Sequence, residues 1–152
     1  MADFNFDFKT RLGQVPDRRN KPRQDGLTMV MDKGLSLSEA EAFLENGAEH
    51  TDLVKLGWST GLFNRKIHDK IHCYRQANIR CYLGGTLFEL FAARQRTDEF
   101  KRLLDELGLD TVEISDGSLD MSQEIKCGYI REFAKDFRVL SEVGSKDAEK
   151  II

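Results

Sequence analysis

Residues 79–91 read Ile-Arg-Cys-Tyr-Leu-Gly-Gly-Thr-Leu-Phe-Glu-Leu-Phe. The apolar run from Ile79 to Leu83 has the length of a β-strand, and the two glycines after it are typical of a turn. Leucine and phenylalanine side chains then recur from Leu87 to Phe91 at the spacing of a helix. A strand that leads through a short turn into a helix is the repeating unit of parallel sheets. This stretch therefore predicts an α/β fold.

The same unit of strand and helix recurs along the chain. We expect five strands, which begin near Leu27, Thr51, Ile79, Asp110 and Phe137. Helical spacing or helix-start signals follow each strand, over 36–47, over 64–77, over 87–107 with a break near Thr97, from Asp120 or Ser122 onward, and over 146–152. The first of these helices begins with Ser36-Leu37-Ser38-Glu39, which has the form of a capping box. The even spacing favours parallel strands with helices packed on the sheet.

Two architectures agree with this pattern. One is an open, doubly wound sheet, and the other is a (β/α)8 barrel of the TIM type, which needs about 220 residues. With 152 residues, the chain would supply about the first five βα units of such a barrel, that is, a partial barrel. We expect residues 1–25 to be an N-terminal extension and residues 26–152 to form one domain. Such a sheet has two open edges, so we expect a homo-oligomer.

Composition excludes several classes of protein. The chain is 40% hydrophobic and 32% charged with a net charge of −3, which is ordinary for a globular protein and argues against nucleic-acid binding as its main role. We expect the basic segment 18–23 to be a solvated loop. No apolar run approaches the roughly 20 residues that cross a bilayer, and the acidic residues 1–7 are unlike an export signal. Cys73, Cys81 and Cys127 lack the spacing of a disulfide framework or zinc site, so we expect a cytoplasmic protein.

Charged and polar side chains occur near the carboxyl ends of the predicted strands. Because side chains alternate between the two faces of a strand, each strand should have one apolar side toward the helices and one mixed side. In the first strand this places Met29 and Met31 on the apolar side. The mixed sides carry Asp32, Lys55, Tyr82, Glu113 and Glu142. Ligands bind at this edge of parallel sheets, whereas the structural alternative is an ion pair of Lys55 with Glu113 or Glu142.

Glycine, hydroxyl and lysine residues follow the same strand ends. They occur at predicted helix starts in segments 32–34, 57–60, 84–86, 116–118 and 144–146. Backbone N–H groups at a helix start can bind phosphate, helped by the helix dipole. The loops therefore predict a small phosphorylated anion, and the nearby carboxylates suit Mg²⁺. The candidate substrate-binding residues are Lys33, Lys55, Trp58, Gly84, Gly85, Thr86, Ser115 and Ser118.

Five segments together resemble the phosphosulfolactate synthase family: GLTMVMDKG (26–34), DLVKLGWST (52–60), CYLGGTLFE (81–89), VEISDGSLDM (112–121) and LSEVGSK (140–146). The resemblance extends over residues 21–152. It implies a (β/α)8 barrel and a lyase that adds sulfite to phosphoenolpyruvate with Mg²⁺. The implied product is (2R)-phospho-3-sulfolactate, an early intermediate of coenzyme M biosynthesis. Plant heat-stress proteins share these motifs, so the alternative is a non-catalytic or differently catalytic barrel relative.

The resemblance also implies a mechanism. Sulfite attacks C3 of phosphoenolpyruvate, negative charge moves onto the substrate carboxylate as an enediolate, and C2 is then protonated. The family's proposed general acid aligns with Lys146. Position and charge assign binding of the substrate's phosphate or carboxylate to Lys33 and Lys55. The same argument predicts the Mg²⁺ ligands Asp32, Glu113 and Glu142.

Overall fold

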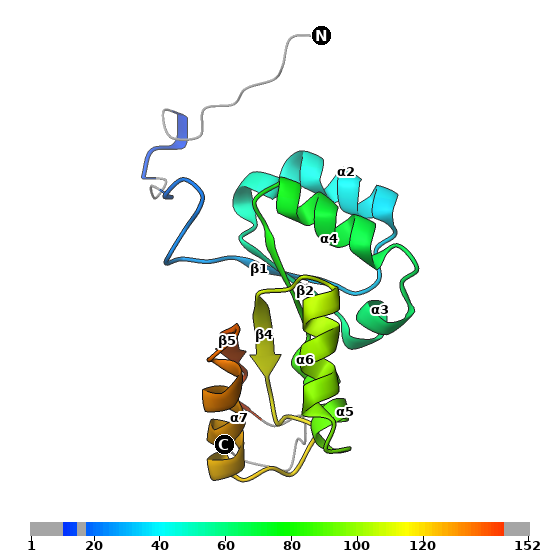
Figure 1. The fold of residues 1–152 in the computed structure, drawn as a ribbon. Helices are drawn as coiled ribbons and strands as arrows, with labels where there is room; N and C mark the ends of the chain where they lie inside the picture. The colour runs from blue at the N-terminus through cyan, green and yellow to red at the C-terminus, as the bar shows by residue number, and fades with distance from the viewer. Residues whose placement is uncertain (1–10, 15–17, 145–152) are drawn as a thin grey trace.

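Five parallel strands stand side by side in the order in which they follow one another along the chain (Figure 1). In the computed structural model, which describes residues 11–14 and 18–144, they are β1 (Met29–Asp32), β2 (Leu53–Leu56), β3 (Arg80–Leu83), β4 (Thr111–Ile114) and β5 (Arg138–Ser141). Each begins one or two residues after its predicted position. The sequential order matches a barrel, whereas strand order reverses in an open doubly wound sheet. The chain therefore has an α/β fold that corresponds to part of a TIM barrel.

Helices connect the strands. They are α2 (Leu37–Gly47), α3 (Trp58–Phe63), α4 (Ile67–Gln76), α5 (Gly85–Ala92), α6 (Thr97–Glu106) and α7 (Gln123–Phe133), with a short 3-10 helix η1 (Ala48–His50). The predicted break near Thr97 is confirmed, because α5 ends before it and α6 begins there. The helix start predicted in segment 57–60 is the start of α3, whose extent was not predicted, and the helix expected over 64–77 is α4. The helix predicted over 146–152 lies outside the described residues.

Two helix starts agree with their sequence signals. The hydroxyl of Ser36 accepts a hydrogen bond from the backbone N–H of Glu39, and the Glu39 carboxylate accepts one from the N–H of Ser36 at 2.8 Å, so the capping box is confirmed. Ser122 caps α7 in a similar way by accepting from the N–H of Ile125. Within residues 11–14 and 18–144, no helix combines the length and apolar character that a bilayer crossing requires.

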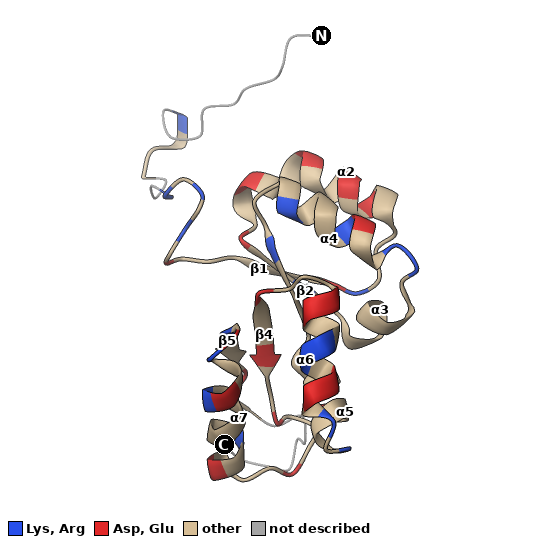
Figure 2. Cartoon of the chain, in the orientation of Figure 1, with Lys and Arg blue, Asp and Glu red and all other residues tan. Residues whose placement is uncertain are grey.

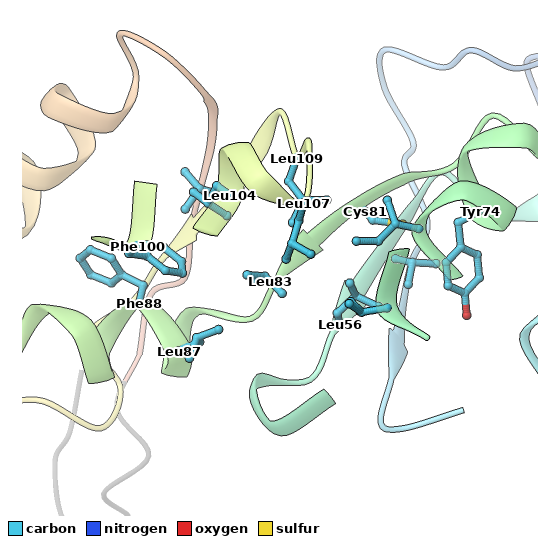
Figure 3. Packing of buried hydrophobic residues seen from close by; sticks show 14 of the residues in the cluster. Leu56, Tyr74, Cys81, Leu83, Leu87, Phe88, Phe100, Leu104, Leu107 and Leu109 are labelled. Atoms are coloured by element: carbon cyan, nitrogen blue, oxygen red, sulfur yellow. The ribbon is translucent and has the colours of Figure 1, made fainter. Parts of the chain in front are cut away.

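The hydrophobic core lies between the helices and one face of the sheet (Figure 3). The strands contribute alternate residues to it, which are Val54, Leu56, Cys81, Leu83, Val112 and Ile114. On the helix side, the Phe88 ring packs edge-on against Phe133 at 5.8 Å between centroids and lies 6.0 Å from Phe100. These aromatic pairs hold α5, α6 and α7 together over β4.

The face assignment predicted for β1 is wrong. Met31 aligns with Lys55, while Asp32 aligns with the core residue Leu56. Asp32 is therefore on the helix side of the sheet and is only 1% exposed, whereas Met29 and Met31 are each 44% exposed on the opposite face. A buried carboxylate is tolerated there because it has a buried cationic partner on α4, described below. We call the face that carries Lys55 the inner face.

The basic segment 18–23 is a loop exposed at four of its six residues, as expected, but Lys21 and Arg23 are partly buried against the strand ends. The Lys21 ammonium donates to the carbonyl oxygens of Ala48 and Ala77 at 2.9 and 3.0 Å. The Arg23 guanidinium lies 2.8 Å from Asp52 Oδ1. The segment thus lies along the amino ends of the strands, where its cations satisfy carbonyl groups and one buried carboxylate.

Candidate functional site

Lys55 and Glu113 meet on the inner face near the carboxyl ends of β2 and β4. Lys55 Nζ lies 2.6 Å from Glu113 Oε1, and the backbone N–H of Gly85 donates to the same oxygen at 2.7 Å. The hydroxyl of Tyr82, on β3, also hydrogen bonds with Glu113. Burial and the neighbouring Glu113 raise the pKa of Tyr82, so this hydroxyl keeps its proton at neutral pH. Three neighbouring strands and a helix start therefore converge on one carboxylate.

Glu142 brings a second carboxylate to the same lysine. It follows β5, and its Oε2 lies 3.8 Å from Lys55 Nζ. The Glu142 side chain is 43% exposed, whereas that of Glu113 is 7% exposed. The ion pair considered from the sequence is thus present, and Lys55 lies between one buried and one accessible carboxylate. This arrangement also gathers two hard oxygen donors around one point.

The turn after β3 requires glycine because the chain passes close to these side chains. A Cβ atom at Gly85 would lie 2.4 Å from the Ser115 hydroxyl oxygen and 2.9 Å from Glu113 Oε1. At Gly84 it would lie 3.1 Å from Cε of Lys55. Gly84 is the N-cap of α5, and Thr86 follows in its first turn. The two glycines therefore let the start of α5 approach the ion pair.

Glu89 on α5 holds the loop after β4, and the sequence reasoning missed it. The Ser115 hydroxyl donates to Glu89 Oε1, and the backbone N–H of Ser118 donates to Glu89 Oε2 at 2.7 Å. Glu89 is 4% exposed. Its sequence signal was a charged residue between Phe88 and Leu90 in an apolar helix.

Lys126 on α7 joins the loops that follow β4 and β5. Its ammonium lies 2.6 Å from Asp116 Oδ1 and donates to the carbonyl oxygen of Glu142 at 2.6 Å. Asp116 belongs to the loop after β4, and Glu142 carries the accessible carboxylate near Lys55. Lys126 therefore fixes the position of both loops relative to α7.

Asp32 lies on the other face of the sheet, in a network of its own. Its Oδ2 is 2.5 Å from Lys70 Nζ and accepts from the Tyr74 hydroxyl at 3.1 Å, both on α4. Its Oδ1 accepts from the N–H groups of Gly34 and Leu35 at 2.8 Å each. Burial alone would raise the pKa of Asp32, but Lys70 and the two N–H groups outweigh it and hold this pKa below its ordinary value. Asp32 therefore does not join Glu113 and Glu142 as the sequence analysis expected.

The remaining predicted residues are spread along the carboxyl edge. Lys33 lines a cavity of about 490 Å³ together with Ser59, Thr60 and Arg65. Lys55 and Glu113 are not part of the lining of this cavity. Trp58, at the start of α3, is 46% exposed. Lys146 lies outside the described residues, so its predicted role stays a prediction.

A ready-made metal cage is absent from the described part of the chain. Within residues 11–14 and 18–144, no three side chains of His, Cys, Asp or Glu come together as potential ligands. The predicted trio is divided because Asp32 faces the helices. Glu113 and Glu142 remain as two carboxylates near one point. Mg²⁺ is commonly held by one or two carboxylates, with waters and substrate oxygens as its other ligands, so this donor set fits it.

Comparison of the sequence with known proteins identifies a family. Residues 16–152 match the family model described as (2R)-phospho-3-sulfolactate synthase (ComA). Proteins named phosphosulfolactate synthase are similar over most of the chain. The protein from Bacillus subtilis is 38% identical over 136 residues, which are 90% of this chain and 54% of the relative. The protein from Methanothermobacter thermautotrophicus is 40% identical over 149 residues, which are 95% of this chain and 55% of the relative. The protein from Methanocaldococcus jannaschii is 43% identical over 131 residues, which are 84% of this chain and 52% of the relative. The chain thus spans about half the length of these relatives.

Replacement of Gly85 by Ala should destabilise the chain. The added methyl group would overlap Ser115, whose Cβ would lie 2.7 Å away, and overpacking of this kind costs about 1–3 kcal/mol. Gly128→Ala on α7 is the matched control, because nothing lies within 4 Å of its Cβ position and alanine favours a helix by about 0.5–1 kcal/mol. Urea unfolding should show opposite signs for the two variants. A Gly85→Ala chain as stable as its parent would contradict the close approach.

Replacement of Asp32 by Asn should lower the free energy of unfolding at pH 7 by about 3–5 kcal/mol, because the buried Lys70 ammonium loses its counter-charge. The pKa of Asp32 in the folded chain is held below the ordinary value of about 4. The ionised carboxylate therefore stabilises the fold above pH 4, and this stabilisation is lost as the pH falls through the pKa of the folded state. The difference in unfolding free energy between parent and variant should therefore shrink in acid. Urea unfolding at pH 7 and pH 3 measures it.

Asp69→Asn is the control for this experiment. Asp69 is on α4 like Lys70, but it forms an exposed pair with Lys66 at 3.2 Å, which contributes at most about 0.5 kcal/mol. If Asp32→Asn cost no more than Asp69→Asn, or if its cost grew in acid, the buried pair would not have the role described.

Proposed function

The chain belongs to the (2R)-phospho-3-sulfolactate synthase family, and we propose that it forms part of an enzyme that adds sulfite to phosphoenolpyruvate. The observation that carries this proposal is the position of Lys55 between Glu113 and Glu142, next to the glycines that begin α5. This cluster lies toward the carboxyl edge of the strands, where TIM barrels hold their active sites. The product would be (2R)-phospho-3-sulfolactate, which the resemblance connects with coenzyme M biosynthesis.

Lys55 provides a fixed positive charge for a substrate that carries both a phosphate and a carboxylate. Its side chain is 12% exposed, so water would screen its interaction with an anion less than at the protein surface. Glu113 keeps the ammonium in place through the contact of 2.6 Å. We assign to Lys55 the binding of one anionic group of phosphoenolpyruvate.

Glu113 and Glu142 are the proposed holders of Mg²⁺. Bound Mg²⁺ would supply positive charge that stabilises the extra negative charge of the reacting substrate. The two carboxylates approach the same ammonium, so both can reach a cation near it. Glu142 is the more exposed of the two and is free to adjust to the substrate. Asp32 has no part in this proposal, because Lys70 and Tyr74 occupy its carboxylate.

The loops of the carboxyl edge complete the proposed substrate site. The residues given this role are Lys33, Trp58, Gly84, Gly85, Thr86, Ser115 and Ser118. The N–H groups of Gly84 and Gly85 already donate to the Leu56 carbonyl oxygen and to Glu113, so the proposed part of these glycines is to let the chain pass close to the substrate. Glu89 positions the loop that contains Ser118 through the contact of 2.7 Å. Lys33 brings a further cation to the cavity beside α3.

The reaction is an addition, so no group leaves the substrate. The sulfur lone pair of sulfite forms a bond to C3, and the electrons of the double bond between C2 and C3 move onto the carboxylate to give an enediolate. A proton delivered to C2 then completes the product. We propose Lys146 as the donor of that proton, because the resemblance aligns it with the family's general acid and it follows the proposed Mg²⁺ ligand Glu142 by only four residues in the sequence.

Self-association is also part of the proposal. Strands β1 and β5 are the outermost of the five, so each leaves one side without a neighbouring strand among the described residues. Met29 and Met31 add exposed apolar surface beside one of these edges. Edges and apolar surface of this kind favour pairing with further chain, and we propose a homo-oligomer.

Glu113→Gln should raise the Mg²⁺ concentration needed for half-maximal turnover by roughly tenfold to a hundredfold, because the site loses a charged oxygen donor. The host is a chimera in which this chain replaces the matched portion of the Bacillus subtilis relative. The measurement is sulfite-dependent loss of phosphoenolpyruvate over a Mg²⁺ titration. Glu45→Gln, an exposed acid on α2, is the control. A loss of stability with an unchanged Mg²⁺ response would favour a purely structural ion pair.

Lys146→Ala in the same chimera should abolish turnover, by at least about a hundredfold, because general acid catalysis contributes that much or more. Binding of phosphoenolpyruvate should persist, since proton transfer is needed only in the transition state. Lys135→Ala, an exposed lysine after α7, is the control. Activity within a few-fold of the parent would remove Lys146 as the proton donor. A folded parent chimera without activity would favour the non-catalytic relative.

A further inference from the structure

A second polar cavity opens at the amino ends of the strands, away from Lys55 and Glu113. Its volume is about 450 Å³, within the range of small-ligand sites. The segment before β1, the loops before β2, β3 and β4, and the first residue of β5 all contribute to its wall. Basic residues mark that segment and the start of β5 (Figure 2). The cationic residues in the lining are Lys21, Arg23, Arg75, Arg80 and Arg138.

The carboxylates in this cavity do not balance the cations. The lining contains five cationic side chains and two carboxylates, Asp52 and Asp110. Asp52 is already engaged, with Arg23 at 2.8 Å and Arg18 at 3.1 Å, and it accepts from the N–H of Thr28 at 2.9 Å. Among the carboxylates of the lining, Asp110 alone therefore remains to face the other cations.

Asp110 is shared by two arginines. Arg80 Nε lies 3.0 Å from Asp110 Oδ2, and Arg138 also attracts this carboxylate. Burial alone would raise the pKa of Asp110, but the Thr111 hydroxyl and the arginines outweigh it and hold this pKa below its ordinary value. The Asp110 side chain is 64% exposed and that of Arg80 39%, so both are accessible from the cavity.

The other two cations contact neutral oxygens. The Arg75 guanidinium donates to the carbonyl oxygen of Gly108, and the Lys21 ammonium donates to two carbonyl oxygens. Carbonyl groups satisfy hydrogen bonds but leave the positive charge uncompensated. Burial lowers the pKa of Lys21, as expected of an ammonium whose nearby negative charge is insufficient.

Arg80 and Arg138 share the inner face of the sheet. Arg80 aligns with Leu53, which is two residues before Lys55 on β2. Arg138 aligns with Thr111, which is two residues before Glu113 on β4. Both arginine side chains therefore extend from the same face of the sheet as the proposed active site, but at the opposite ends of the strands. Guanidinium groups bind oxyanions through two parallel hydrogen bonds, which suits multivalent anions.

We propose that this cavity binds a small oxyanion with two or more negative charges, of the phosphate-ester or polycarboxylate class. Arg80 and Arg138 would form its main contacts, and Arg75 and Lys21 would add longer-range attraction. The proposal does not depend on the reaction at the carboxyl edge. A purely structural clamp, in which the same cations only hold the strand ends together, predicts no binding.

Calorimetric titration of the chain with pyrophosphate, and separately with citrate, at fixed ionic strength tests this. Saturable binding of at least one of these anions is expected, and the tighter of the two identifies the anion class. The double variant Arg80→Gln/Arg138→Gln should bind at least tenfold more weakly. Arg102→Gln, which removes an exposed charge from α6, should bind as the parent does. No saturable binding, or equal binding by the double variant, would overturn the proposal.

Asp110→Asn provides a test of opposite sign. Removal of this carboxylate frees Arg80 and Arg138 for the added anion, so affinity should increase several-fold. Asp110 is exposed, so we expect the variant to fold as the parent does, and circular dichroism checks that it is folded. A structural clamp would lose stability without any gain in anion binding. Weaker or unchanged binding by the folded variant would therefore also overturn the proposal.

Discussion

The carboxyl edge of this sheet depends on how the charge of Glu113 is accommodated. A carboxylate that is almost fully buried costs several kcal/mol unless it is paired and hydrogen bonded. Here Lys55 supplies the opposite charge and the backbone of Gly85 supplies a donor. That donor reaches Glu113 only because residue 85 has no side chain. The ion pair, the turn after β3 and the start of α5 are therefore mutually dependent, and a change in one alters the other two.

The repeating pattern was sufficient to predict the order and approximate position of the strands. Apolar runs of strand length, separated by helical spacing, located each strand to within two residues. The capping box at Ser36 located one helix start, and the choice between Asp120 and Ser122 for another was decided by the structure in favour of Ser122. These features are local, so neighbouring residues determine them. The sequential strand order is not local: the spacing of the runs left two architectures open, the family resemblance implied a barrel, and the order seen in the structure excluded the doubly wound alternative.

The candidate site could be predicted only where the polar residues of a strand lie on the inner face and its apolar residues lie toward the helices. Lys55, Tyr82 and Glu113 obey it, and the structure places them on the inner face. Asp32 does not, because its partner Lys70 is 38 positions later in the sequence and no local pattern connects them. Glu89 was missed for a similar reason, since the loop that it holds follows a different strand. Long-range charge pairs of this kind determine which face a polar residue occupies.

The two contacts of Lys126 have a mechanical consequence. One ammonium on α7 holds both the loop after β4 and the backbone after β5, each at 2.6 Å. A displacement of α7 therefore moves both loops as one unit, and neither can rearrange alone without breaking a bond to the same atom. Motion at this part of the edge is consequently concerted, with a single lysine side chain as the coupling element between two consecutive βα turns.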